Sequence, residues 1–128
     1  MLRGLIALGG AVATGAGVHT ALTGSRAVPG FGREAPVDPV LDSELRFFGA
    51  IYTAFGIGVL AVAAQPEPAP AAVRGIAAAV FGAGLARVVG WRRVGRPSPG
   101  QLALLAVELT APPALVALQG AQPPVSPG

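Results

Sequence analysis

Residues 41–60 read LDSELRFFGAIYTAFGIGVL, and this stretch decides the fold. From Phe47 to Ala64 the chain carries no charge for 18 residues. A helix needs roughly 20 apolar residues to cross a bilayer core about 30 Å thick. Three charges in five residues, Asp42, Glu44 and Arg46, stand directly before the apolar run. The stretch therefore predicts a membrane-spanning helix that begins beside a cluster of opposite charges.

The composition extends this reading to the whole chain. Of the 128 residues, 52% are hydrophobic and only 12% are charged, and the mean hydropathy is +0.63. A soluble protein of this size has a large surface that polar residues must cover, so we expect lipid to cover much of this one. The absence of cysteine excludes disulfides, thiol catalysis and thiolate metal sites. A net charge of +3 without long basic runs argues against a nucleic-acid partner.

Four apolar windows of membrane length occur, at residues 4–24, 45–64, 71–91 and 100–119. Polar or Pro-rich breaks separate them, and residues 120–128 form a Pro-rich tail that we expect to be disordered. Only helices and closed barrels satisfy backbone groups in lipid, and the runs do not alternate as strands do. We predict an all-α, up-and-down four-helix bundle, with one four-span domain over residues 1–119. A cleaved signal peptide in the first window and a soluble helical bundle are the alternatives.

Small residues recur at a spacing of four in three of the windows. Such a spacing puts a smooth stripe on one helix face and lets two backbones approach closely, although a chain rich in Ala and Gly also produces it by chance. The three series are Gly9, Ala13 and Gly17; Ala50, Ala54 and Gly58; and Ala78, Gly82 and Ala86.

The distribution of arginine predicts the orientation in the membrane, because cytoplasmic loops carry an excess of basic residues. In a four-span topology the first and third connections lie on one side, with Arg26, Arg33, Arg92, Arg93 and Arg96. The other side carries only Arg3 and Arg74. We therefore expect both termini outside a cell inner membrane and the two Arg-rich connections in the cytoplasm.

Charges inside the spans indicate a buried polar network. Glu108 lies about 8 residues into the fourth window, roughly 12 Å deep at 1.5 Å per residue. A charge this deep is costly and a short carboxylate cannot snorkel, so Glu108 is expected to be protonated or paired. Arginine suits a buried carboxylate best. We predict a central contact between Glu108 and Arg87, with Arg46 and Glu44 in the same half of the membrane.

Simpler roles exist for several of these residues. Asp42 can cap the second helix and acids in its first turn suit the helix dipole. Arg87 can snorkel beside Trp91, which then acts as an interfacial anchor. His19 has no second His or Cys near it in the sequence, so we expect an interfacial or network role and no metal. The pair Pro112–Pro113 follows Glu108 and frees carbonyls in the preceding turn.

Three segments carry a resemblance to a known family: DSELRFFGAIYTAFGI, GAGLARVVGWRRVGRPSP and ELTAPPALV. They resemble the small bacterial membrane proteins known as domain of unknown function 4345, over about residues 4–118. The matching positions are Asp42, Glu44, Arg46, Phe47, Gly84, Arg87 with the GRP of residues 95–97, Glu108 and Pro112, and Val89 or Gly90 stands where the family often has Ser. The resemblance implies four transmembrane helices. More distantly, the layout is similar to DoxX-like membrane proteins, some of them linked to redox chemistry.

The chain has no catalytic or cofactor-binding motif, so we expect a role other than catalysis and no cofactor. Our leading hypothesis is a binding or accessory module in the lipid bilayer, for a small lipophilic ligand or a partner in a membrane complex. One alternative is a redox-associated enzyme or partner that uses Glu108 for proton transfer. Another is a small-molecule transporter, which would need to oligomerise because four helices enclose a narrow conduit.

Overall fold

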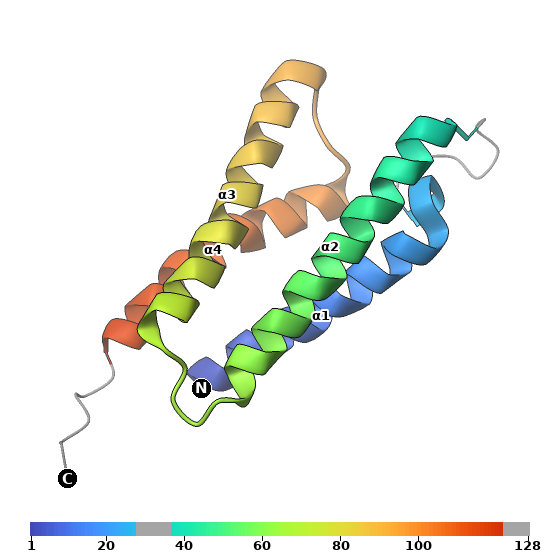
Figure 1. The fold of residues 1–128 in the computed structure, drawn as a ribbon. Helices are drawn as coiled ribbons and strands as arrows, with labels where there is room; N and C mark the ends of the chain where they lie inside the picture. The colour runs from blue at the N-terminus through green and yellow to red at the C-terminus, as the bar shows by residue number, and fades with distance from the viewer. Residues whose placement is uncertain (28–36, 122–128) are drawn as a thin grey trace, which may run out of the picture. The chain divides into compact units, whose positions relative to one another are not determined.

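A computed structural model describes residues 1–27 and 37–121 (Figure 1). This part of the chain contains four α-helices and no strand: α1 (Leu2–Thr23), α2 (Pro39–Ala64), α3 (Pro70–Val94) and α4 (Pro99–Gly120). A short 3-10 helix, η1 (Gly24–Ala27), follows α1. Each α-helix is long and apolar enough to cross a membrane, which fits a multi-pass membrane protein. The prediction of an all-α chain with four membrane-length helices is confirmed.

The helices begin earlier than the apolar windows because polar and proline residues open them. Asp38 caps α2, and its carboxylate accepts hydrogen bonds from the backbone N–H groups of Val40 (2.8 Å) and Leu41 (3.0 Å). Pro39 follows at the first helical position, where its missing N–H costs nothing. Ser98 and Pro99 open α4 in the same way. At 26 residues α2 is about 39 Å long, longer than the bilayer core, so its charged first turns reach the headgroup region.

The chain divides into two compact units, one ending at Glu67 and the other beginning at Pro68. Each is a helical hairpin, the first made of α1, η1 and α2 and the second of α3 and α4. The prediction of one domain over residues 1–119 stays a prediction. Arg33 and residues 122–128 of the predicted tail lie outside the described residues.

Four glycines bring α1 and α2 into close contact. A Cβ on Gly17 would collide with the backbone of Thr53 and Gly49, and one on Gly49 with the backbone of Ala21 and Gly17. The same reciprocal contact joins Gly10, two turns earlier in α1, and Gly56, two turns later in α2. Because the contacts pair the end of α1 with the start of α2, the helices are antiparallel.

This contact corrects the predicted stripes of small residues. Of the four glycines in the predicted stripes, only Gly17 lies in a helix contact, whereas a Cβ on Gly9, Gly58 or Gly82 would meet nothing within 4 Å. The residues that matter in each helix follow a G-x3-T-x2-G pattern, at residues 10–17 and 49–56. In both, the threonine hydroxyl donates to the carbonyl of the first glycine at 2.8 Å. That bond satisfies the hydroxyl within its own helix and leaves a small surface for the partner.

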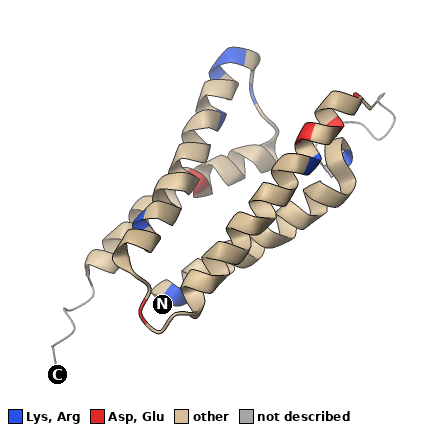
Figure 2. Ribbon diagram, viewed as in Figure 1, with Lys and Arg blue, Asp and Glu red and all other residues tan. Residues whose placement is uncertain are grey.

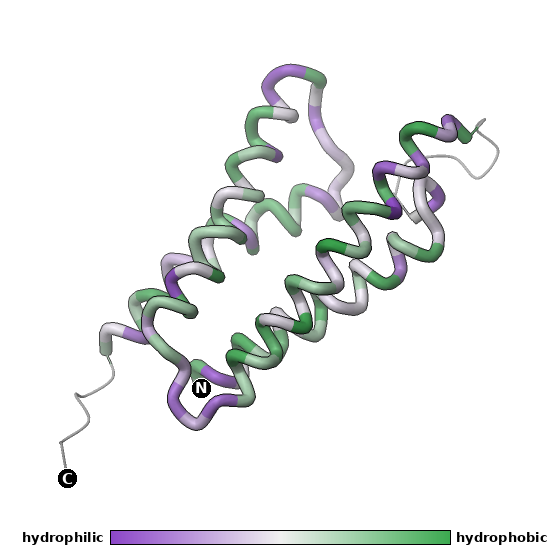
Figure 3. The backbone as a smooth tube through the Cα atoms, viewed as in Figure 1, coloured by the Kyte–Doolittle hydropathy of each residue, from purple (hydrophilic) through white to green (hydrophobic). Residues whose placement is uncertain are grey.

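Large apolar side chains cover the outside of the helices. Phe47, Phe48 and Ile51 on α2 are each half exposed or more, and Leu104 and Val107 on α4 are also exposed. Figure 3 shows hydrophobic residues along all four helices and hydrophilic ones mainly at the connections, while Figure 2 shows that most charges lie near helix ends. On a soluble protein so much exposed apolar surface would cause association, and lipid is the solvent that suits it.

Candidate functional site

The α3–α4 hairpin contains an ion pair far from its helix ends. The Arg87 Nε donates to Glu108 Oε2 at 2.8 Å. The Glu108 side chain is only 13% exposed, whereas that of Arg87 is 42% exposed. Counted at 1.5 Å per residue, Arg87 lies about 10 Å from the end of α3 and Glu108 about 13 Å from the start of α4. The structure thus brings together the two residues that the sequence predicts as the central contact.

Gly84 is the reason that α4 can come this close to α3. It is buried and lies one turn before Arg87, on the same face of α3. A Cβ added to Gly84 would lie 2.9 Å from Leu109 Cδ2 and 3.1 Å from Glu108 Cβ. Because this position has no side chain, the stem of Glu108 packs directly on the α3 backbone and its carboxylate reaches the Arg87 guanidinium.

Two prolines increase the polarity of α4 beside the ion pair. Pro112, which is buried, and Pro113 both lie inside the helix and have no N–H to donate. The carbonyls of Glu108 and Leu109, four residues earlier, therefore lack their usual helical donors. α4 remains α-helical through this point, and Figure 1 shows that it is not straight. Freed carbonyls near Glu108 were expected from the sequence.

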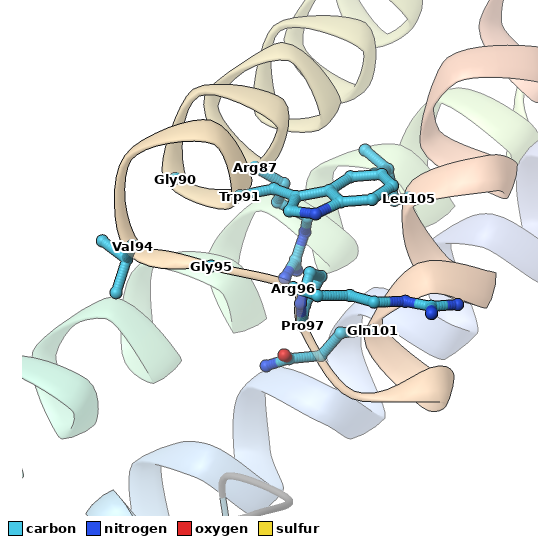
Figure 4. A pocket seen from close by; sticks show the side chains of 9 residues that line it. All are labelled: Arg87, Gly90, Trp91, Val94, Gly95, Arg96, Pro97, Gln101 and Leu105. Carbon is cyan, nitrogen blue, oxygen red and sulfur yellow. The ribbon is translucent and has the colours of Figure 1, made fainter.

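A pocket of about 600 Å³ opens beside Arg87 at the connecting end of the α3–α4 hairpin. Figure 4 shows the indole of Trp91 over the side chain of Arg87, with Arg96 and Gln101 around the same space. Residues of α3, of the connection after it and of α4 all contribute to the lining. They are Arg87, Gly90, Trp91, Val94, Gly95, Arg96, Pro97, Gln101 and Leu105.

Both polar and apolar side chains line this pocket. Arg87, Arg96 and Gln101 supply hydrogen-bond donors, and Trp91, Val94, Pro97 and Leu105 supply apolar surface. Ligand sites in proteins have volumes of about 300–1,000 Å³ and combine apolar walls with a few polar groups. The pocket therefore has the size and composition of a site for a small amphipathic molecule.

Asp42 does not cap α2, which corrects a prediction from the sequence. The cap is Asp38, because α2 begins at Pro39 and Asp42 lies a turn inside the helix. Asp42 instead accepts from the backbone N–H of Ser25 at 2.9 Å and from its hydroxyl at 3.0 Å, and so satisfies the start of η1. Gly24 makes this possible, since its φ of 59° and lack of Cβ leave room for the carboxylate.

Arg46 binds within the first hairpin. Its Nε donates to Asp42 Oδ2 at 2.7 Å, and its Nη1 donates to the carbonyls of Ala21 (3.2 Å) and Leu22 (2.7 Å) at the end of α1. Glu44 is exposed and makes no hydrogen bond or ion pair with another residue in the described ranges. The prediction that Arg46 and Glu44 join Arg87 and Glu108 stays a prediction, since the two pairs belong to different hairpins.

His19 and Trp91 occupy different environments. His19 is exposed on α1, and its carbonyl accepts a hydrogen bond from the Thr23 hydroxyl at 2.6 Å. Trp91 is 41% exposed and lines the pocket one turn after Arg87. In the described ranges, no group of three or more His, Asp or Glu residues could hold a metal ion.

Arg96 and Gln101 are site residues that the sequence reasoning did not single out. Arg96 counts among the loop charges and belongs to the family-matching GRP segment, and Gln101 falls in the fourth apolar window. A signal was present, since the six residues RPSPGQ at positions 96–101 contain an arginine, a helix-opening Ser-Pro pair and an amide. A short connection with such a cap turns sharply, so it holds both side chains near the end of α3.

A protein-family model matches residues 1–119 of the chain, and its description reads "Domain of unknown function (DUF4345)". The match includes all four helices except the last residue of α4 and contains every residue that lines the pocket. No curated protein matches the chain. No solved structure matches it either.

Proposed function

The chain belongs to the DUF4345 family, whose description assigns no activity, and we propose that it acts as a membrane-embedded binding module. The observation that carries the proposal is the pocket of about 600 Å³ beside the Arg87–Glu108 ion pair. It combines apolar walls with a fixed guanidinium, and such a combination suits a small amphipathic molecule taken from the bilayer.

The ion pair gives the pocket a fixed polar wall. Because Glu108 Oε2 accepts from Arg87 Nε, the guanidinium is held in one orientation. An arginine without this partner would sample many rotamers, and ordering it would cost free energy on binding. Glu108 therefore serves in the proposal as a positioning residue for Arg87.

A glycine in the lining allows a direct test by steric filling. Gly90 lines the pocket, and a Cβ there meets nothing within 4 Å, so Gly90→Leu fills the pocket without disturbing helix packing. Gly82→Leu is the matched control, since Gly82 also lies on α3 with open space around it but outside the lining. We expect native mass spectrometry of the detergent-solubilised protein to detect a retained small molecule or lipid in wild type and in the Gly82→Leu variant. Gly90→Leu should lose it, and equal retention in both variants would place the binding site elsewhere.

We also propose that the Arg-rich connection of the α3–α4 hairpin faces the cytoplasm, in a cell inner membrane. The basic residues Arg26, Arg33, Arg92, Arg93 and Arg96 support this orientation against Arg3 and Arg74 on the other side. The pocket then opens towards the cytoplasmic leaflet. The redox-associated and transport roles drawn from the sequence stay predictions.

A further inference from the structure

We propose that the pocket binds the phosphate headgroup of an anionic amphiphile, with the phosphate between Arg87 and Arg96. The inference rests on the proposed function, since it names the chemical class of the molecule that the pocket would take. It follows from three features of the hairpin: guanidinium donors with no protein partner among the described residues, the absence of an acidic lining residue, and an apolar wall at the depth of Arg87.

Guanidinium N–H groups at the pocket lack partners among the described residues. Arg87 uses Nε for Glu108, and its Nη1 and Nη2 make no hydrogen bond with any residue that the structure describes. Arg96 makes none with its guanidinium in the same part of the chain, although it lines the pocket. A guanidinium has five N–H donors in a planar fork, which matches the oxygens of phosphate. The two guanidiniums at this pocket therefore have N–H groups that can donate hydrogen bonds to an anion.

The charge of the hairpin is strongly positive at this end. From Pro68 to Ala121 the chain has five arginines and one acid, Glu108. No Asp or Glu lines the pocket, and Arg92 and Arg93 lie in the last turn of α3 beside it. Basic pockets at the end of transmembrane helices attract phosphate-bearing lipid headgroups. Arg96 is exposed, so its charge is accessible to a ligand, and a cationic ligand would meet repulsion here whereas an anionic one would be attracted.

Apolar lining residues lie deeper than Arg96, at the level of Arg87 and between the two arginines. Leu105 is only 6% exposed and follows Ser98 by seven residues, which places it about 10 Å along α4 from the connection. Trp91 lies on the facing side, and a tryptophan at this depth has an apolar face and an N–H that suit the interface. A molecule with its phosphate at Arg96 would therefore lay its chain against Leu105 and Trp91. This arrangement favours an amphiphile over a wholly soluble anion.

Trp91 is the chain's one tryptophan and lines the pocket, so its fluorescence reports on that site. The protein is reconstituted in phosphatidylcholine vesicles with brominated phosphatidylglycerol or brominated phosphatidylcholine at equal mole fraction, because bromine near the indole quenches it. We expect about fivefold tighter apparent binding of the anionic lipid, the factor that one arginine near a lipid headgroup supplies. Arg96→Ala should remove most of that preference.

Arg93→Ala is the matched control, because Arg93 lies at the same end of α3 but does not line the pocket. It should keep the preference. Equal losses in Arg93→Ala and Arg96→Ala would mean attraction to the whole basic surface and would overturn the proposal. Arg96→Gln, with circular dichroism on each variant, separates loss of charge from loss of fold.

Two further arms identify the source of the phosphate and separate this inference from the proposed function. If inorganic phosphate at millimolar concentration relieves the quenching by the anionic lipid, the pocket takes a free anion and the lipid assignment is wrong. If both brominated lipids quench equally and Gly90→Leu reduces both, the binding module stands and the anionic class fails. If Gly90→Leu changes neither, both proposals fail.

Discussion

Breaking the Arg87–Glu108 pair from one side should destabilise the protein, whereas removing both charges should not. Arg87→Met keeps the apolar stem of the arginine and leaves Glu108, 13% exposed, without its partner. An unpaired charge costs about 2.5–3.5 kcal/mol at the bilayer centre. Glu108 lies about 13 Å from the start of α4, close to the middle of a 30 Å core. We therefore expect a loss of about 2–3 kcal/mol in the free energy of unfolding.

The reverse substitution should cost less, because Arg87 can relax. In Glu108→Leu the guanidinium is already 42% exposed, and its long side chain can extend about 10 Å toward the end of α3. A loss of about 1 kcal/mol is expected, which is the size of an ordinary hydrogen bond, because the relaxed guanidinium recovers part of its solvation. The double variant Arg87→Met, Glu108→Leu has an apolar pair in an apolar surrounding and should lie within about 1 kcal/mol of wild type. The coupling energy of the cycle is then about 2–4 kcal/mol.

Reversible unfolding in mixed detergent micelles measures these differences, with Trp91 fluorescence and far-ultraviolet circular dichroism as two probes. Arg74→Met is the control, since Arg74 is exposed on α3 and makes no ion pair within the described residues, and it should change stability by less than about 0.5 kcal/mol. Additive effects in the double variant would refute the reasoning, because they would mean that the two side chains do not stabilise one another. A stable double variant that no longer retains a ligand would separate the binding role of the pair from its structural one.

Two substitutions in the first hairpin and a reporter at the C-terminus test the helix packing and the orientation. Gly56→Ala should lower the stability of the α1–α2 hairpin by about 1–2 kcal/mol, because its Cβ meets the backbone of Thr14 and Gly10. Gly58→Ala has open space around it and should be neutral or stabilising in the same micelle unfolding assay. Equal effects of the two variants would contradict the helix packing. Arg46→Ala should lower the free energy of unfolding by about 1–2 kcal/mol, since two carbonyls of α1 and the Asp42 carboxylate lose a donor. Thermal unfolding measures this loss, and Glu44→Ala, at an exposed position, should show none. A reporter that works only in the cytoplasm should be inactive when fused to the C-terminus, and activity would reverse the proposed orientation.

The sequence predicts the four helices and the ion pair well, for one physical reason. In lipid a backbone must form its hydrogen bonds within a helix, so an apolar run of sufficient length leaves few other structures. Lipid also makes an isolated carboxylate costly, so the sequence predicts an arginine partner for Glu108. Arg87 was the available partner at that depth, and the structure places its Nε 2.8 Å from the carboxylate.

Features that depend on contacts between different parts of the chain could not be predicted in the same way. The start of α2 lies in a segment that reads as a loop, and the Asp38–Pro39 pair that opens the helix was hidden among other prolines. Abundant Ala and Gly produced several equivalent stripes, and only the contact with a second helix shows that Gly10, Gly17, Gly49 and Gly56 matter. The pocket depends on how the short connection turns, which no spacing along one helix determines.

The way each hairpin uses its arginines explains why we place the site on α3 and α4. In the first hairpin Arg3 donates to the carbonyls of Ala63 and Ala64 at the end of α2, and Arg46 donates to those at the end of α1. These bonds satisfy carbonyls that every helix end leaves free, so they have a structural purpose.

In the second hairpin the arginines serve no such purpose. Arg87 donates to a side chain instead of a helix end, and Arg96 donates to no described residue. The fold of α3 and α4 does not need the Arg96 charge, because Ser98 and Pro99 already open α4 and the N–H of Gly95 already closes α3. Our proposal that these two arginines bind an anion from outside the chain rests on this difference: Arg87 is held by a mostly buried acid, and the exposed Arg96 is not used by the hairpin.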